Sequence, residues 1–338
     1  MDEQYDYGLD EGESFEPLDD PDDDIDVSLP HIMTLLGPID PGALGIALHH
    51  EHIFNHTNPL AATDDDLIID DIVASAADVE LFFGAGGRAL VDMGPVDYGR
   101  SITDLLVIAA HSPVHILVTT GHHKRLIAAP FVGDDSVDAI TGRNIRDIRD
   151  GIDGTTARAG LVKAGTSLNE ITDIEQRVLK AAAVTQIKTG VPISTHTELG
   201  TMALEQMTVL TAAGADPARV ILGHLDAQIA DRRYLIAVLQ TGAFVSFDRW
   251  TRFDMAPDEL RASVLHELAS AGYLDQLLIS GDFARKSNHL GYGGQFGFDY
   301  MLDRVPLMLM DAGFDAPSVR QLLVENPARA LTIHPPTA

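Results

Sequence analysis

The stretch GIALHHEH, residues 45–52, is a short apolar run that ends in three histidines and a glutamate within four positions. An apolar run without polar alternation is typical of a parallel strand that is buried on both faces. Burying the polar groups at the end of this run is costly unless they have partners or bind something. Because side chains alternate along a strand, His50 and His52 share one face. We therefore interpret the stretch as a strand that carries a functional pair at its carboxyl end.

Seven further runs of this kind follow along the chain, with helical patterns between them. They are residues 88–93, 115–121, 158–163, 191–196, 219–224, 243–248 and 276–282. The clearest helix pattern begins at Thr172, which forms a capping-box motif with Glu175, and it stops at Gly190. Segments 201–214 and 256–272 are amphipathic in the same way. Eight strand–helix units predict an α/β fold, the (β/α)8 TIM barrel.

The composition predicts one folded domain and an acidic extension. Hydrophobic residues make up 45% of the chain, which is enough for a full core. Residues 1–30 contain 13 of the 51 acidic residues and few aliphatic ones. We expect residues 1–30 to be a disordered acidic tail and residues 31–338 to form the barrel. The alternative is that the tail docks onto a partner or raises solubility.

Several classes of function are disfavoured by composition alone. The absence of cysteine excludes disulfides, thiolate metal ligands and a cysteine nucleophile. A net charge of −28 argues against nucleic acid as a partner, because phosphate binding needs positive charge. We see neither a signal peptide nor an apolar run long enough to span a membrane, so we expect a cytoplasmic protein without a membrane partner. No G-x-S-x-G motif is present, which disfavours a serine hydrolase.

Polar residues end most of the predicted strands, and in a barrel those ends converge on one mouth. They are His50, His52, Lys163, His196, His224, Asp248 and Asp282. Imidazole and carboxylate donors without thiolates suit Zn²⁺ or Mn²⁺ in a catalytic site. A single histidine of this kind could be a core residue bonded to backbone, and Lys163 could be a salt-bridged or snorkelling lysine. Four histidines at strand ends are harder to explain as core filler.

The motifs HHEHIF, AGLVKAGTS, TGVPISTHTELGT, VILGHLD, FVSFDRW, LLISGDF and ENPARAL occur in this order between about Leu35 and Leu331. Together they resemble the phosphotriesterase family of the amidohydrolase superfamily. The resemblance implies a barrel hydrolase with two divalent metal ions, zinc with manganese or cobalt as alternatives. It also implies that a hydroxide and a carbamylated lysine bridge the two ions.

By motif, the resemblance implies six metal ligands: His50, His52 and Asp282 at the buried ion, His196 and His224 at the more exposed one, and Lys163 at both. A free ammonium group would be repelled by two cations. Carbamylation of Lys163 by CO2 turns it into an anion and removes this conflict. The bridging hydroxide would be the nucleophile, and Asp282 would orient it and accept its proton.

The substrate class is less closely defined by the resemblance. Arg249, which follows Asp248, resembles lactonase-type members, whereas phosphotriesterases carry a histidine there. His122 and His123 stand where lactonases often carry a tyrosine. We expect a zinc-dependent lactonase or carboxylic ester hydrolase in a catabolic role, with promiscuous phosphotriesterase activity. The alternatives are an amidohydrolase that cleaves an N-acyl amine bearing an acidic group, and a non-catalytic binding barrel.

Four cations near the predicted mouth point to an anionic group on a small-molecule substrate, such as a phosphorylated lactone. They are Arg249, Arg252, Arg285 and Lys286. In the alternative interpretation, Arg249 pairs with a barrel carboxylate, and Arg285 and Lys286 are solvated loop charges. The predicted substrate contacts are His123, Arg249, Trp250, Arg285 and Lys286, and Arg249 is also assigned to catalysis. The oligomeric state is left open, with a homodimer as one option.

Overall fold

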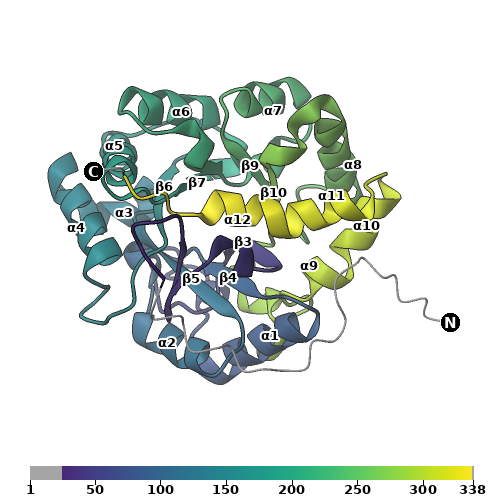
Figure 1. Ribbon diagram of the computed structural model, residues 1–338, viewed down its shortest axis with the longest axis horizontal. Coiled ribbons are helices and arrows are strands. Elements are labelled where there is room, and N and C mark those ends of the chain that lie inside the picture. The colour runs from purple at the N-terminus through teal and green to yellow at the C-terminus, as the bar shows by residue number, and fades with distance from the viewer. Residues whose placement is uncertain (1–24, 337–338) are drawn as a thin grey trace.

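The computed structural model describes residues 25–336, and at its centre eight parallel strands form one sheet in chain order (Figure 1). The strands are β3 (Ala47–Glu51), β4 (Ala89–Asp92), β5 (His115–Gly121), β6 (Leu161–Thr166), β7 (Ile193–Thr197), β8 (Val220–Leu222), β9 (Phe244–Phe247) and β10 (Leu277–Ile279). Each lies within or overlaps one of the eight predicted runs. The predicted (β/α)8 fold class is confirmed.

The sheet closes on itself between its first and last strands. Within the part of the chain that the structure describes, no backbone ladder joins β3 to β10. The two strands instead exchange bonds near their carboxyl ends: Asp282 N–H donates to the carbonyl of His50 at 3.0 Å, and His50 N–H donates to Ser280 Oγ at 3.0 Å. The closing seam of the barrel therefore runs through two of the predicted metal ligands.

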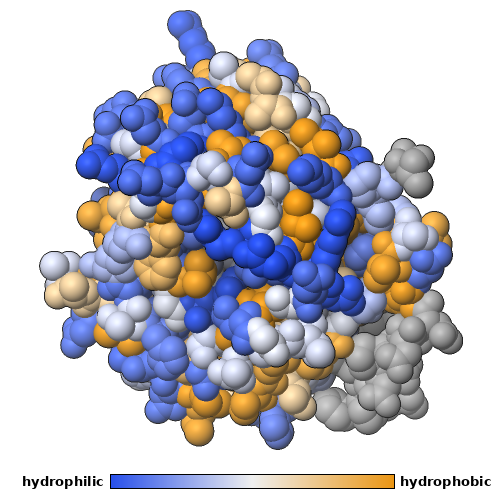
Figure 2. All heavy atoms as spheres, turned by 90° about the vertical axis from the view of Figure 1, so that its left-hand side faces the viewer, coloured by the Kyte–Doolittle hydropathy of each residue, from blue (hydrophilic) through white to orange (hydrophobic). Residues whose placement is uncertain are grey.

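Helices surround the sheet (Figure 1). They are α1 (Ile72–Gly84), α2 (Ile102–Ala110), α3 (Arg125–Val132), α4 (Val137–Arg149), α5 (Asp173–Thr189), α6 (Ala203–Ala212), α7 (Arg232–Leu239), α8 (Asp258–Leu268), α9 (Tyr300–Asp303), α10 (Val305–Asp311), α11 (Ala316–Arg320) and α12 (Asn326–Leu331). Helix α5 begins at the predicted capping box, in which Thr172 and Glu175 bond reciprocally, and it ends at Gly190 with φ of 80°. Helices α6 and α8 lie inside the other two predicted segments. On the face in Figure 2, hydrophobic residues are scattered among hydrophilic ones.

A short antiparallel hairpin, β1 (Ile32–Thr34) and β2 (Gly37–Ile39), precedes the barrel and was not predicted. Its residues Ile32 and Ile39 belong to one apolar cluster with Ala89 and Leu117, which lie in the first half of β4 and β5, and with Leu331 of α12. The hairpin and α12 therefore cover the amino-terminal end of the barrel. The carboxyl end, where the polar strand ends lie, is left for the site.

The predicted tail, residues 1–30, falls largely outside the described residues. Of its last part, the structure describes a turn in which Leu29 N–H donates to the carbonyl of Asp26 at 2.8 Å. The ordered barrel begins beside it, where His31 forms a bridge with Ile333. Among the helices of residues 25–336, none combines the length and the apolarity needed to cross a membrane.

Candidate metal centre

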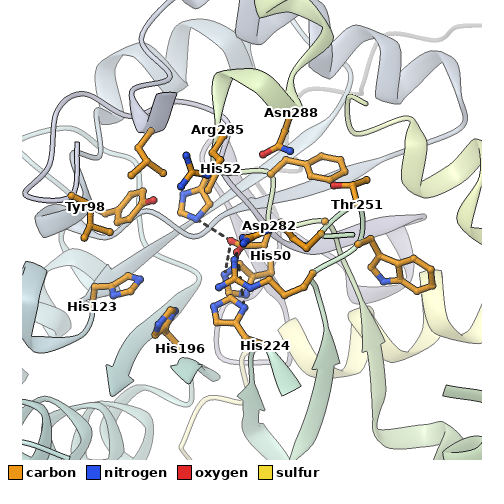
Figure 3. Close-up of a pocket in the computed structure, with 18 of the residues that line it drawn as sticks. His50, His52, Tyr98, His123, His196, His224, Thr251, Asp282, Arg285 and Asn288 are labelled. Carbon is orange, nitrogen blue, oxygen red and sulfur yellow. Dashed lines mark hydrogen bonds and ion pairs between the residues drawn. The ribbon is translucent and has the colours of Figure 1, made fainter. Parts of the chain in front are cut away.

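The polar strand ends meet in a pocket of about 200 Å³ at the carboxyl end of the barrel (Figure 3). Five of the six predicted ligands line it, namely His50, His52, His196, His224 and Asp282. The sixth, Lys163 on β6, is 1% exposed and lies beneath the pocket, with its Nζ 3.2 Å from His50 Nε2. The structure therefore brings all six predicted ligands into one cluster.

Asp282 lies between the two histidines of the HxH pair (Figure 3). Its Oδ1 is 3.4 Å from His50 Nε2 and 3.3 Å from His52 Nε2. These donor atoms are close enough together to hold one metal ion. Burial by itself would raise the pKa of Asp282, but Arg249 and His52 outweigh it and hold that pKa well below the ordinary value. Asp282 is therefore a carboxylate at neutral pH.

Asp248, directly after β9, forms a second group with His50 and His224. Its Oδ1 lies 2.7 Å from His224 Nδ1 and its Oδ2 lies 3.2 Å from His50 Nδ1. It also accepts the hydroxyl proton of Ser246 at 2.7 Å. One carboxylate thus contacts two imidazoles through their Nδ1 atoms, which fixes the orientation of both rings and leaves Nε2 free to point elsewhere.

His196 extends the cluster toward the pocket wall. Its ring centroid lies 4.6 Å from that of His224 and 4.4 Å from that of His123. Its Nε2 contacts Glu198 Oε2 at 2.7 Å, and Lys124 Nζ forms an ion pair with the same carboxylate. Burial lowers the pKa of His196 well below its ordinary value, so the ring is neutral and can act as an electron-pair donor.

Protonation states across the cluster favour cation binding. Burial, followed by the positive charge of Lys163, lowers the pKa of His50 well below its ordinary value, and burial also lowers that of His224. Burial lowers the pKa of Lys163 to about 8, and Asp282 and Asp248 partly oppose that shift. A larger fraction of Lys163 is therefore uncharged than of an exposed lysine, and the uncharged amine is the form that reacts with CO2. Neutral imidazoles around a carboxylate are a donor set that suits Zn²⁺ or Mn²⁺.

The predicted cations are all paired with carboxylates. Arg249 forms an ion pair with Asp282. Arg285 NH1 lies 2.5 Å from Asp64 Oδ2 and 3.5 Å from Asp66 Oδ2. The other two contacts are Lys286 with Asp70 at 3.4 Å and Arg252 with Asp254 at 2.9 Å. The Arg249 pair matches the alternative interpretation of that residue, while the Arg285 side chain is 38% exposed and is also bonded to Asp64 and Asp66.

Four of the five predicted substrate contacts line the pocket: His123, Arg249, Trp250 and Arg285. Lys286 lies outside this lining. Trp250 is completely buried and its indole N–H donates to the carbonyl of Phe247 at 3.0 Å, so it supports the pocket wall. Contact of these residues with a substrate stays a prediction.

Several lining residues were missed by sequence reasoning. Tyr98, after β4, stacks on His123 with ring centroids 5.6 Å apart. Lys124 and Glu198 form the ion pair beside His196, and the other missed lining residues are Leu60, Leu67, Thr251, Gly281, Phe283, Ala284 and Asn288. Lys124, Glu198 and Thr251 carried a usable signal, since each follows a predicted strand end by two or three positions. Tyr98 and Leu60 lie in loops without a periodic pattern.

Comparison with known proteins identifies the family of the chain. The model of the phosphotriesterase family matches residues 30–331. The chain belongs to this family. It is 32% identical to the phosphotriesterase homology protein of Escherichia coli (strain K12), over 84% of this chain and 97% of that protein. It is 29% identical to the phospho-furanose lactonase of Mycoplasmopsis agalactiae, over 90% of this chain and 92% of that protein.

Among solved structures, a lactonase from Listeria monocytogenes superposes with a TM-score of 0.85 at 34% identity. The match covers 90% of this chain and 99% of that chain. A more distant relative is the N-acetyltaurine hydrolase of Danio rerio, at 26% identity over 89% of this chain and 97% of that protein. Lactonases and an amide-cleaving hydrolase are thus both among the relatives of this chain.

Proposed function

We propose that this protein is a binuclear metal-dependent hydrolase that opens the ester bond of a lactone bearing an anionic group. The observation that carries the proposal is the position of Asp282, with one carboxylate oxygen within 3.4 Å of both His50 Nε2 and His52 Nε2 and the other paired with Arg249. The phospho-furanose lactonase relative supports the choice of a phosphorylated lactone.

The residues of this chain divide the metal-binding roles as follows. One divalent ion would be held by His50, His52 and Asp282, the other by His196 and His224, and a carbamate on Lys163 would bind both. We expect zinc, with manganese or cobalt as alternatives. When bound, such ions supply a water nucleophile that ionises at neutral pH, and they polarise the scissile carbonyl.

The chain's own groups then handle the proton and the substrate. Asp282, kept as a carboxylate, accepts the proton released as water attacks. Asp248 keeps the rings of His50 and His224 in place through their Nδ1 atoms. Arg249 uses one nitrogen on Asp282, and we assign the rest of its guanidinium fork to the anionic group of the substrate.

A second candidate is hydrolysis of an N-acyl amine that carries a sulfonate or carboxylate, which the N-acetyltaurine hydrolase relative favours. Metal ions held by the same candidate ligands would also polarise an amide carbonyl, so the positions of these ligands are compatible with both reactions. A promiscuous phosphotriesterase activity is also part of the proposal. The proposed partner is a small molecule, and a homodimer and a cytoplasmic location stay predictions from the sequence.

Metal analysis combined with one substrate panel tests the proposal. The panel contains phosphorylated and unphosphorylated lactones, N-acyl amines with and without an acidic group, and phosphotriesters. We expect about two divalent ions per chain and the highest kcat/KM on a phosphorylated lactone, at least about tenfold above its unphosphorylated analogue. Turnover of amides alone would favour the second candidate. A protein that binds no metal and turns over nothing would be a binding barrel.

A further inference from the structure

Glu51 lies between two predicted ligands in sequence but does not point into the pocket. It is completely buried, with an exposed fraction of 0%, and it is not among the residues that line the pocket. Because neighbouring side chains alternate along a strand, Glu51 faces away from His50 and His52. Its carboxylate reaches the far side of the barrel seam, where the chain leaves β10.

There, Glu51 accepts three hydrogen bonds from residues that lie just beyond the end of β10. Its Oε1 accepts the hydroxyl proton of Ser280 at 2.7 Å and the backbone N–H of Gly281 at 2.5 Å. Its Oε2 accepts the backbone N–H of Phe283 at 3.0 Å. The two backbone donors are the residues immediately before and after Asp282.

Asp282 itself adopts an unusual backbone conformation. Its φ is 48°, in the left-handed region that residues with a Cβ seldom occupy, although aspartate tolerates it better than most. Such a conformation persists only where surrounding bonds define it. The Phe283 carbonyl contacts His289 Nε2 at 2.9 Å. The backbone N–H groups of the turn make three bonds, those of Gly281 and Phe283 to Glu51 and that of Asp282 to the carbonyl of His50. Two of the three therefore end on one carboxylate.

We propose that Glu51 is a positioning residue that fixes the left-handed turn at Asp282, and thereby holds the Asp282 carboxylate between His50 and His52. Glu51 is the last residue of β3, which also carries His50, and His52 follows it directly, so Glu51 ties both parts of the candidate metal group to one strand end. The consequence for metal binding rests on the proposed function. The consequence for the turn does not, because it follows from hydrogen bonds within the chain.

A matched control exists elsewhere in the barrel. Glu175 is also 0% exposed, and it also accepts one serine hydroxyl and two backbone N–H groups. The donors are Ser167 Oγ at 2.6 Å, Arg125 N at 2.8 Å and Thr172 N at 2.8 Å. None of these donors is next to a candidate metal ligand in sequence, whereas Gly281 and Phe283 flank Asp282. A change at Glu175 therefore reports what it costs in general to disturb a buried carboxylate with this set of bonds.

The experiment compares Glu51→Gln and Glu175→Gln with the wild-type chain, all full length. Glutamine preserves the shape of the side chain but replaces one acceptor oxygen with an NH2 donor. One of the N–H or O–H groups that bonded to the glutamate therefore faces another donor. Three quantities are measured: the melting temperature of the metal-free protein, the Co²⁺ affinity and absorption spectrum, and the hydrogen exchange of residues 276–285 without metal. Co²⁺ is the probe because its visible spectrum reports the geometry of its ligands.

We expect both variants to melt at a lower temperature. Only Glu51→Gln should also weaken Co²⁺ binding, by about 10- to 100-fold, which is the range for groups that orient metal ligands. It should alter the Co²⁺ spectrum and speed the exchange of residues 276–285 as well. Glu175→Gln should keep both the spectrum and the exchange of that segment. Glu51→Gln with wild-type affinity and wild-type exchange overturns the inference.

Two further outcomes are separable. If the wild-type protein binds no Co²⁺, the proposed metal centre is wrong, and exchange of residues 276–285 then decides alone whether Glu51 holds the turn. If Glu51→Gln does not fold, Glu51→Asp replaces it. That variant keeps the carboxyl group but is one methylene too short to reach both flanking N–H groups, so faster exchange is expected and unchanged exchange overturns the inference.

Discussion

Replacing Arg261 by methionine should destabilise the protein by about 3–5 kcal/mol at pH 8, the usual effect of removing one partner from a buried ion pair. Arg261 lies on α8 and is completely buried. Its guanidinium donates to Asp226 Oδ2 at 2.8 Å and to Asp258 Oδ1 at 2.7 Å. It also donates to the carbonyls of Ala256 at 2.7 Å and Arg252 at 3.1 Å. Methionine fills the apolar part of this space but leaves two buried carboxylates without their cation.

The size of the effect should depend on pH in a definite direction. Burial raises the pKa of Asp258, and its bonds to Tyr300, Thr251 and Arg261 only partly oppose that shift. A carboxyl whose pKa is raised by folding contributes stability that is complete below its unfolded pKa and is lost as pH rises through the folded value. Removing Arg261 raises the folded pKa further. The difference between variant and wild type should therefore be smaller at pH 5 than at pH 8.

Activity should fall together with stability, because the same carboxylates hold the loop that carries Arg249. Arg249 N–H donates to Asp226 at 3.0 Å, and Thr251 N–H donates to Asp258 at 3.1 Å. Once these acceptors move, Arg249 no longer keeps its place beside Asp282. We expect kcat/KM to drop at temperatures where the variant is still fully folded.

Urea denaturation at pH 5 and pH 8, followed by circular dichroism, measures the effect. Arg232→Met is the control: Arg232 Nε contacts Glu267 at 2.8 Å, but the two side chains are 33% and 54% exposed. An exposed pair contributes about 0–1 kcal/mol. If Arg261→Met is no less stable than this control at pH 8, or if its deficit is the same at both pH values, the buried triad does not stabilise the fold as argued.

Three other predictions follow from the candidate centre and the tail. Purified protein should carry about two divalent ions per chain; His50→Ala and His224→Ala should each lose metal and turnover together, whereas full turnover after chelation would contradict the mechanism. Lys163→Ala should lose most activity and recover part of it with bicarbonate or a short-chain acid, while Lys163→Arg should not recover; wild-type metal content and rate in Lys163→Ala would rule out a bridging role. Deleting residues 1–30 should leave the melting temperature and kcat nearly unchanged, and a large loss of either would show that the tail docks on the barrel.

The strands could be predicted because burial on both faces demands continuous apolar sequence, and each run then stops at the polar residues that line the mouth. His50, His196 and His224 line the pocket, as this argument predicts, because each lies within two positions of the end of its strand, while their role as metal ligands stays a prediction. The hairpin of β1 and β2 escaped because three-residue strands are too short to show a period. Its role is visible only once Ile32 and Ile39 are seen to join the apolar cluster that covers the amino-terminal end of the barrel.

The partners of the charged residues could not be predicted individually, because they are remote in sequence; the sequence offered only the alternative that Arg249 pairs with some barrel carboxylate. Arg285 contacts Asp64 across 221 positions, and Arg249 contacts Asp282 across 33. No local pattern links such residues. The role of Asp248 was hidden for the same reason: its place at a strand end was evident, but its simultaneous contact with His50 and His224 depends on barrel closure.

The site therefore has two parts, one formed by residues at the strand ends and one formed by residues in the loops after the strands. The candidate ligands stand at or just beyond strand ends, whereas Tyr98, Lys124, Glu198, Arg249 and Arg285 all lie in the segments after strands. Each cation in the second group is already paired with a carboxylate of the chain. In the proposed function, an anionic group binds Arg249 through the guanidinium nitrogens that Asp282 does not use, whereas at Lys124 or Arg285 it would compete with Glu198 or Asp64. We therefore expect these loop ion pairs to influence which lactone, amide or phosphotriester the protein accepts.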